Sequence, residues 1–166
     1  MLKLRRVVTI WAVVAMSAVV LAAVPGGTPA VADGNESTSN SFPARSVSAG
    51  RGHTCAIVAD AAVRCWGRND VGQLGLGDTA ARGNDPGEMG TNLPTVALGT
   101  GRHATALAAG GFHTCALLDN GTVKCWGENG SGQLGLGNTG DRGDAGGERG
   151  DALPAVALGT GRTATA

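Results

Sequence analysis

The feature that most constrains this chain is a segment that occurs twice. Residues 113–137 repeat residues 53–77 with an offset of 60 positions and without a gap. A fixed period of this length indicates a repeat architecture, in which each copy forms one supersecondary unit and buries its apolar faces against its neighbours. The sequence therefore predicts two equivalent structural units in the chain of 166 residues.

Each copy contains two short runs of β-compatible residues separated by a turn. In the second copy, residues 113–118 and 122–127 flank an Asp-Asn-Gly loop at 119–121. A three-residue hairpin loop commonly places its last residue in the left-handed region, which glycine adopts without strain. The first copy has Ala61 in place of this glycine, at an expected cost of ~1 kcal/mol. The pattern predicts one β-hairpin per copy.

The four cysteines of the chain face each other in pairs in this hairpin register. The register places Cys115 opposite Cys125 and Cys55 opposite Cys65, and a cross-strand disulfide needs that proximity. Two alternatives are four buried thiols and a metal site built on the two His-x-Cys segments. Paired disulfides leave no thiolate for a metal, so we expect disulfides, no metal, and structural histidines at the strand starts.

Both faces of the second hairpin are expected to be buried. Leu117 falls on one face of the second hairpin, and Leu118 and Trp126 fall on the other. A sheet with one solvent-exposed face would show a polar residue at every second position. A small sheet covered on both faces is typical of a propeller blade. Further strands near 105–109 and 154–158 would bring each unit to about four strands.

Two sequence patterns recur in the same order in both copies. The pattern Gly-x-x-His-Thr-Cys-Ala-Leu occupies residues 110–117, and Val-x-Cys-Trp-Gly-x-Asn-x-x-Gly-Gln-Leu-Gly-x-Gly occupies residues 123–137. Together they resemble the repeat of the regulator of chromosome condensation family, over roughly residues 47–166. Members of that family fold as a β-propeller, usually of seven blades, so the resemblance implies an all-β fold with two blades of an incomplete ring. The expected structural motif residues are His53, Trp66, Gly67, Gly72, Gln73, Leu74, Gly75, His113, Trp126, Gly127, Gly132, Gln133, Leu134 and Gly135.

The first 32 residues have the order of a secretory signal peptide. Three basic residues precede an uncharged apolar run over residues 7–24, and an Ala-Val-Ala sequence at 30–32 supplies a small-residue cleavage site. An uncleaved N-terminal hydrophobic helix is the alternative, and only that would attach the chain to a membrane, because the run is nearly long enough to span one. Either reading places the repeats in the secreted fraction or the cell envelope, where cysteines commonly form disulfides.

The predicted organisation is a signal peptide at 1–32, a disordered linker at 33–46 that is rich in Ser and Asn, a first repeat at 47–106 and a second at 107–166. The second repeat ends within the strand that should open a third unit. Two blades cannot close a ring. We therefore expect a truncated member that needs either the remaining blades of a longer chain or self-association.

Composition excludes several function classes. The formal net charge is zero, and no basic stripe is present, so nucleic acid is not expected as a partner. The glycine-rich residues 72–77 lack the Gly-Lys-Ser/Thr of a phosphate loop. No catalytic motif is recognisable, and no cofactor is expected. The polar segments 78–92 and 138–152 are the expected binding loops, and the two Arg-Gly-Asp tripeptides in the second are expected to be incidental.

The sequence thus predicts a non-catalytic protein-interaction module, a secreted or cell-envelope propeller fragment that binds an unidentified protein through its loops. The resemblance also implies two alternatives. The family's best-known activity is guanine-nucleotide exchange on a small nuclear GTPase with chromatin contact, which export disfavours. Some exported bacterial propellers of this type inhibit an enzyme, including β-lactamases, through loops on one face.

Overall fold

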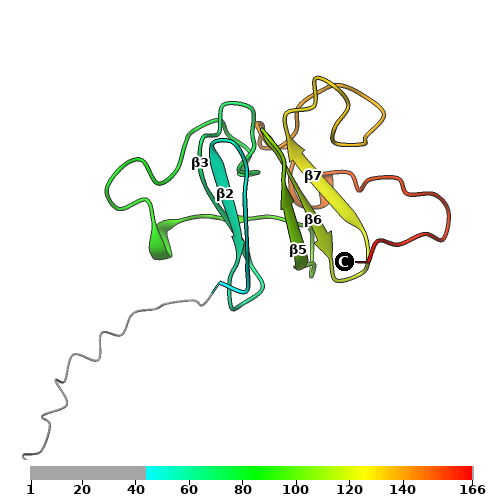
Figure 1. The fold of residues 1–166 in the computed structure, drawn as a ribbon, viewed down its shortest axis with the longest axis horizontal. Coiled ribbons are helices and arrows are strands. Elements are labelled where there is room, and N and C mark those ends of the chain that lie inside the picture. Colours follow the sequence, from blue (N-terminus) through cyan, green and yellow to red (C-terminus); the bar gives the residue numbers. More distant parts are fainter. Residues whose placement is uncertain (1–43, 166) are drawn as a thin grey trace, which may run out of the picture. The chain divides into compact units, whose positions relative to one another are not determined.

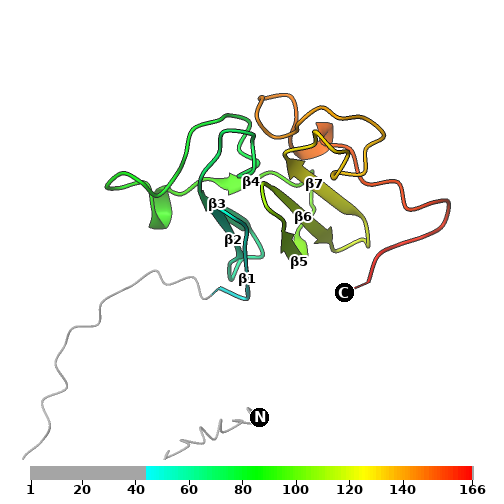
Figure 2. The same cartoon turned by 45° about the horizontal axis from the view of Figure 1, so that its top comes forward.

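The structure, a computed structural model, describes residues 44–165. The predicted signal peptide and all but the last three residues of the predicted linker lie outside the described residues. The described part is built from two antiparallel sheets (Figures 1 and 2), so the predicted all-β class and the two blade-like units are confirmed. The strands are β1 (Ser46–Ala49), β2 (His53–Ile57), β3 (Val63–Gly67), β4 (Thr95–Val96), β5 (Ala104–Ala109), β6 (His113–Leu118) and β7 (Val123–Gly127).

The strand order of the first sheet is β1-β2-β3-β4, and that of the second is β5-β6-β7. The prediction of about four strands per unit is therefore confirmed for the first unit and wrong for the second, whose described residues form three. The strand expected near 154–158 is reduced to a single bridge between Lys124 and Ala155. In the first unit, the segment after β4 carries Leu98, which is buried against the second sheet, whereas its counterpart Leu158 is 39% exposed. The fourth strand is therefore present in the unit whose following segment packs against a second sheet, and reduced to a bridge in the unit whose following segment is exposed.

The first strand of each unit begins earlier than the repeat boundaries suggest. Ser46, the last residue of the predicted linker, is the first residue of β1. Strand β5 runs through the predicted boundary between residues 106 and 107. Each unit therefore starts on the strand that precedes the hairpin.

The hairpins have the predicted register. Cys55 pairs with Cys65 across β2 and β3, and Cys115 pairs with Cys125 across β6 and β7. Each pair forms a disulfide, and the structure contains no free cysteine.

The two turns reach the same backbone conformation with different residues. Gly121 has φ +76°, and Ala61 has φ +61°. A Cβ atom on Gly121 would also lie 2.7 Å from Cβ of Thr163, so glycine is required there for space as well as for conformation. Ala61 is the only non-glycine residue with positive φ among the described residues.

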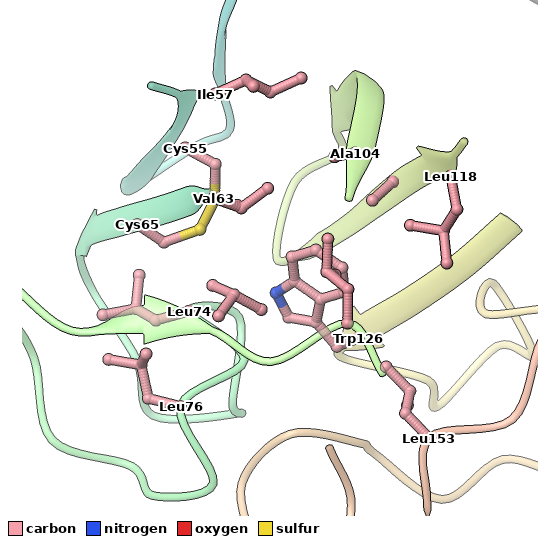
Figure 3. Close-up of a cluster of buried hydrophobic side chains, with 13 residues drawn as sticks. Cys55, Ile57, Val63, Cys65, Leu74, Leu76, Ala104, Leu118, Trp126 and Leu153 are labelled. Atoms are coloured by element: carbon pink, nitrogen blue, oxygen red, sulfur yellow. A yellow bond between two sulfur atoms is a disulfide. The ribbon is translucent and has the colours of Figure 1, made fainter. Parts of the chain in front are cut away.

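The core lies between the two sheets, where the cysteine face of the first meets the tryptophan face of the second (Figure 3). Cys55, Val63 and Cys65 are fully buried on one side, and Trp126 is fully buried on the other. The prediction that both faces of the second hairpin are buried is wrong for most of its outer face, where Cys125 is buried but Leu117 is not. Trp66 and Leu117 are only partly buried because no further sheet covers them within residues 44–165.

Two short 3-10 turns, at Gly90–Asn92 and Gly150–Ala152, are the helical elements of the described part. Neither they nor any other described element is an apolar helix of membrane-spanning length.

Candidate functional site

The repeat motif builds the junction between the two sheets around one carbonyl oxygen, that of Gln73. Trp126 Nε1 donates to it at 3.0 Å, and Thr114 Oγ1 donates to it at 3.2 Å. Thr114 and Trp126 are cross-strand neighbours on β6 and β7. The loop after β3 thus supplies the hydrogen-bond acceptor that a fully buried tryptophan needs.

His53, at the start of β2, completes this junction. Its Nε2 lies 2.8 Å from Thr114 Oγ1, and because that hydroxyl donates to Gln73, the imidazole is the donor. Burial lowers the pKa of His53, and the nearby His113 lowers it further. Nδ1 is buried without a hydrogen-bond partner among the described residues. His53 is therefore a neutral structural donor.

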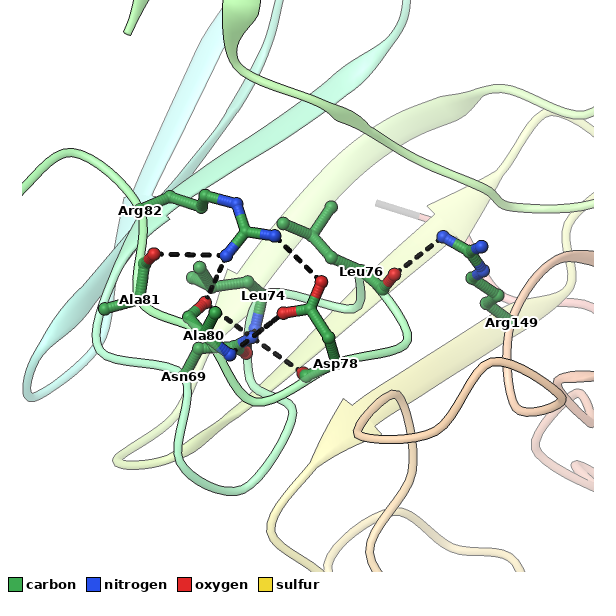
Figure 4. Close-up of polar contacts among 8 residues, drawn as sticks. All are labelled: Asn69, Leu74, Leu76, Asp78, Ala80, Ala81, Arg82 and Arg149. Atoms are coloured by element: carbon green, nitrogen blue, oxygen red, sulfur yellow. Dashed lines mark hydrogen bonds and ion pairs between the residues drawn. The ribbon is translucent and has the colours of Figure 1, made fainter. Parts of the chain in front are cut away.

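The Gly-Gln-Leu-Gly loop of the first unit is held by Asn69 (Figure 4). Leu74 N donates to Asn69 Oδ1 at 2.9 Å, and Asn69 Nδ2 donates to the carbonyl oxygens of Asp78 and Ala80 at 2.8 and 3.0 Å. A Cβ atom on Gly75 would lie 2.8 Å from Trp126 Nε1. The loop can therefore lie against the indole only because this position is glycine.

Asn69 and its counterpart Asn129 are buried structural residues that the predicted site omitted. Asn129 makes the same bonds to its own loop, accepting from Leu134 N at 3.0 Å and donating to the carbonyls of Asn138 and Gly140. The signal that identifies them is a polar residue at the same position of both copies, five residues before the motif leucine.

The structure brings only part of the predicted motif together. His53, the loop from Gly72 to Gly75, and Trp126 meet at the junction between the sheets. Trp66 lies on the outer face of the first sheet, and the loop at 132–135 lies on the outer side of the second, where Gly135 is exposed.

A pocket of about 210 Å³ opens beside Trp66 on the outer face of the first sheet. Arg64 lines it and donates to the carbonyl oxygens of Gly90 and Leu93. The pocket is lined by Ala44, Ala56, Val58, Arg64, Trp66, Gly90 and Leu93. Its lining is largely apolar, and no group of three or more potential metal ligands occurs anywhere in residues 44–165.

The loop at 78–92 is exposed and internally bonded. One carboxylate oxygen of Glu88 accepts the backbone N–H groups of Gly83, Asn84 and Asp85 at 2.8, 3.2 and 3.2 Å. These bonds, that from Asp85 most, lower the pKa of Glu88. The following residue, Met89, is 44% exposed. The loop therefore presents an apolar side chain from an ordered backbone.

The loop at 138–152 differs in that two of its charged residues contact the first unit. Arg149 donates to the Leu76 carbonyl at 2.6 Å (Figure 4). Asp151 accepts from the N and Oγ1 of Thr100 at 2.9 and 2.6 Å. In the other Arg-Gly-Asp tripeptide, Arg142 pairs with Glu148 at 3.4 Å. Both tripeptides are thus engaged within the chain.

Sequence comparison identifies the repeat. Two family profiles, both described as the regulator of chromosome condensation (RCC1) repeat, match this chain, one at residues 44–73 and 104–133 and the other at residues 61–117. The chain is 42% identical over 90 residues to Protein RCC2 homolog of Danio rerio, and the match covers 54% of this chain and 16% of that protein. It is 40% identical over 96 residues to the human probable E3 ubiquitin-protein ligase HERC3, covering 58% of this chain and 8% of that protein.

Among solved structures, the chain is similar to Prp20p from Saccharomyces cerevisiae, which was studied for its binding to Gsp1p and histones. The sequence identity is 24% and the TM-score is 0.48, over 64% of this chain and 25% of that one. This chain therefore spans a quarter or less of the length of these three proteins.

Proposed function

This chain belongs to the regulator of chromosome condensation (RCC1) repeat family, and from that premise we propose that it is a non-catalytic protein-interaction module that acts outside the cytoplasm. The loop at 78–92 binds the protein partner. Export is supported by the signal-like sequence of residues 1–32 and by the pairing of all four cysteines in disulfides.

The observation that carries this proposal is the contrast between the two long loops. In the loop at 138–152, Arg149 and Asp151 form hydrogen bonds with the first unit. The loop at 78–92 leaves Met89 exposed over a backbone that Glu88 holds in place. Binding to an ordered loop loses less conformational entropy than binding to a flexible one, and methionine adapts readily to a partner surface.

The test uses the full chain with both disulfides formed, as bait for proteins of the culture medium and the cell surface of its source organism. Met89→Glu is compared with Gly147→Glu, which places the same charge on the exposed part of the other loop, where a new side chain meets nothing within 4 Å. We expect saturable binding of one protein by the wild-type chain and by Gly147→Glu, and loss of that binding in Met89→Glu. Equal binding by both variants, or binding that does not saturate, would refute the proposal.

Export is tested separately by fractionation and N-terminal sequencing. We expect the chain outside the cytoplasm, beginning at Asp33. Recovery of the intact chain in the cytoplasm would refute this part of the proposal and leave the loop experiment unaffected.

A further inference from the structure

The residues that line the pocket beside Trp66 correspond to residues of the second unit that are, with one exception, buried between the two sheets. The seven lining residues, shifted by 60 positions, are Ala104, Ala116, Leu118, Lys124, Trp126, Gly150 and Leu153. All but Gly150 are buried, on the side of the second sheet that packs against the first. The equivalent residues therefore line a buried interface in one unit and an open pocket in the other.

Inside the molecule, the cysteine face of the first sheet packs against these residues of the second sheet. The second unit carries an equivalent cysteine face that no sheet covers in the described part of the chain. The first sheet presents Cys55, Ile57, Val63, Val96 and Leu98, all 7% exposed or less. The counterparts on the second sheet, which we call the outer cysteine face, are Cys115, Leu117, Val123, Val156 and Leu158 with the loop at 132–137. All five named side chains are partly or largely exposed. One chain thus carries both halves of the same interface, facing outward on different sheets.

We propose that the pocket beside Trp66 binds the outer cysteine face of a second copy of this chain, so that copies associate head to tail. The interface is heterologous, because a different surface of each copy takes part. Each dimer therefore keeps one free pocket and one free outer cysteine face. Assembly then continues with concentration rather than stopping at a dimer.

The polar groups needed for this packing are also repeated. Inside the chain, Trp126 Nε1 and Thr114 Oγ1 share the Gln73 carbonyl. In the head-to-tail complex, Trp66 and Thr54 would meet the carbonyl of Gln133 from the second copy. These three residues are partly exposed in the single chain, so each is accessible for the bond that its counterpart makes.

Polar contacts of three side chains across the internal interface are not repeated. One is the bond that Ser48 Oγ accepts from Ala109 N at 2.8 Å, because Ala108 stands at the position that corresponds to Ser48. Arg149 and Asp151 bind the first unit across the junction, and their counterparts in the first unit are Met89 and Thr91. The intermolecular interface therefore lacks three charge-assisted hydrogen bonds, one from Arg149 and two to Asp151, which makes it weaker than the internal one. This difference supplies a gain-of-function test.

The first experiment measures the mass of the full chain, with both disulfides formed, by sedimentation velocity over a range of concentrations. The wild-type mass should rise with concentration. Ala44→Arg obstructs the pocket, and Leu158→Asp charges the outer cysteine face. Both residues are exposed in the single chain, so both variants should fold and remain monomeric. Trp66→Ala serves as a second pocket variant if Ala44→Arg disturbs β1.

Mixing the two variants tests the head-to-tail geometry. Each retains one intact half, so an equimolar mixture of Ala44→Arg and Leu158→Asp should form a one-to-one dimer and nothing larger. A wild-type chain that stays monomeric throughout, a single variant that still assembles, or a mixture that stays monomeric would overturn the proposal.

The second experiment introduces the residues of positions 149 and 151 at the equivalent positions 89 and 91 of the first unit. The double variant Met89→Arg/Thr91→Asp should associate at least about tenfold more tightly than the wild type, because a hydrogen bond to a charged group adds that much or more. Unchanged or weaker association of this correctly disulfide-bonded variant would contradict the proposed register.

Discussion

The two repeats place the same residues in opposite environments. Trp126 is fully buried and has a hydrogen-bond acceptor, whereas Trp66 is partly exposed beside an open pocket. The disulfides reverse this order, since Cys55 is fully buried and Cys115 is partly exposed. Each unit therefore covers one face of the other and leaves its own opposite face open. In a repeat fold, the neighbour determines how much a given motif residue contributes to stability.

The tryptophan pair offers the largest contrast. Trp126→Ala should reduce the free energy of unfolding by about 3–5 kcal/mol, because it opens a cavity in the core and leaves the Gln73 carbonyl with one donor fewer. Trp66→Ala should cost about 1–2 kcal/mol, since less of its surface is removed from water. The measurement is urea unfolding at a concentration where the chain is monomeric. Equal losses in the two variants would show that the sheets do not pack as described.

The two disulfides should differ in accessibility rather than in strength. Each closes a loop with a sequence separation of 10, so each should stabilise the chain by about 3 kcal/mol through the unfolded state. Reductant reaches the partly exposed Cys115 before the fully buried Cys55. We expect partial reduction, followed by alkylation and mass mapping, to label Cys115 and Cys125 first. Simultaneous labelling of all four cysteines would indicate that the chain opens globally before either bridge is reduced.

Local pairing could be predicted from the sequence because its determinants lie within one copy. The turn residues set the register that brings Cys115 opposite Cys125. The burial of each face could not be predicted, because nearly identical copies carry no signal that says which neighbour is present. The contacts of the loop at 138–152 with the first unit could not be predicted for a related reason. Arg149 contacts Leu76, which is 73 positions away, and no local pattern records that contact.

The two turns provide a smaller contrast that tests backbone strain. Ala61→Gly should raise the free energy of unfolding by up to about 1 kcal/mol, because glycine adopts φ +61° without strain. Gly121→Ala should lower it by more than that, since the new Cβ atom also meets Thr163. Thermal unfolding of the two variants beside the wild type measures both changes. Stabilisation by Gly121→Ala would contradict the close approach of Thr163 to this turn.

The smallest expected effect is a pH dependence that arises from His53 in the first unit. The folded pKa of His53 lies below its ordinary value of 6.5, because of burial first and His113 second. The unfolded chain therefore binds a proton more readily than the folded chain as the pH falls below about 6.5. Stability from this site is fully present above that pH and is lost progressively as the pH falls toward the folded pKa.

His53→Gln isolates this contribution, because its side-chain amide retains a donor for Thr114 and does not titrate. We expect the urea midpoint of the wild type to fall between pH 7.5 and pH 5, and to fall less in His53→Gln. His103→Gln is the matched control, since His103 is exposed and lies outside the junction, and it should behave as the wild type does. If His53→Gln retained the full wild-type decrease, the acid sensitivity would have to come from groups outside the junction between the sheets. His53 would then be no more than a packing residue in the first repeat.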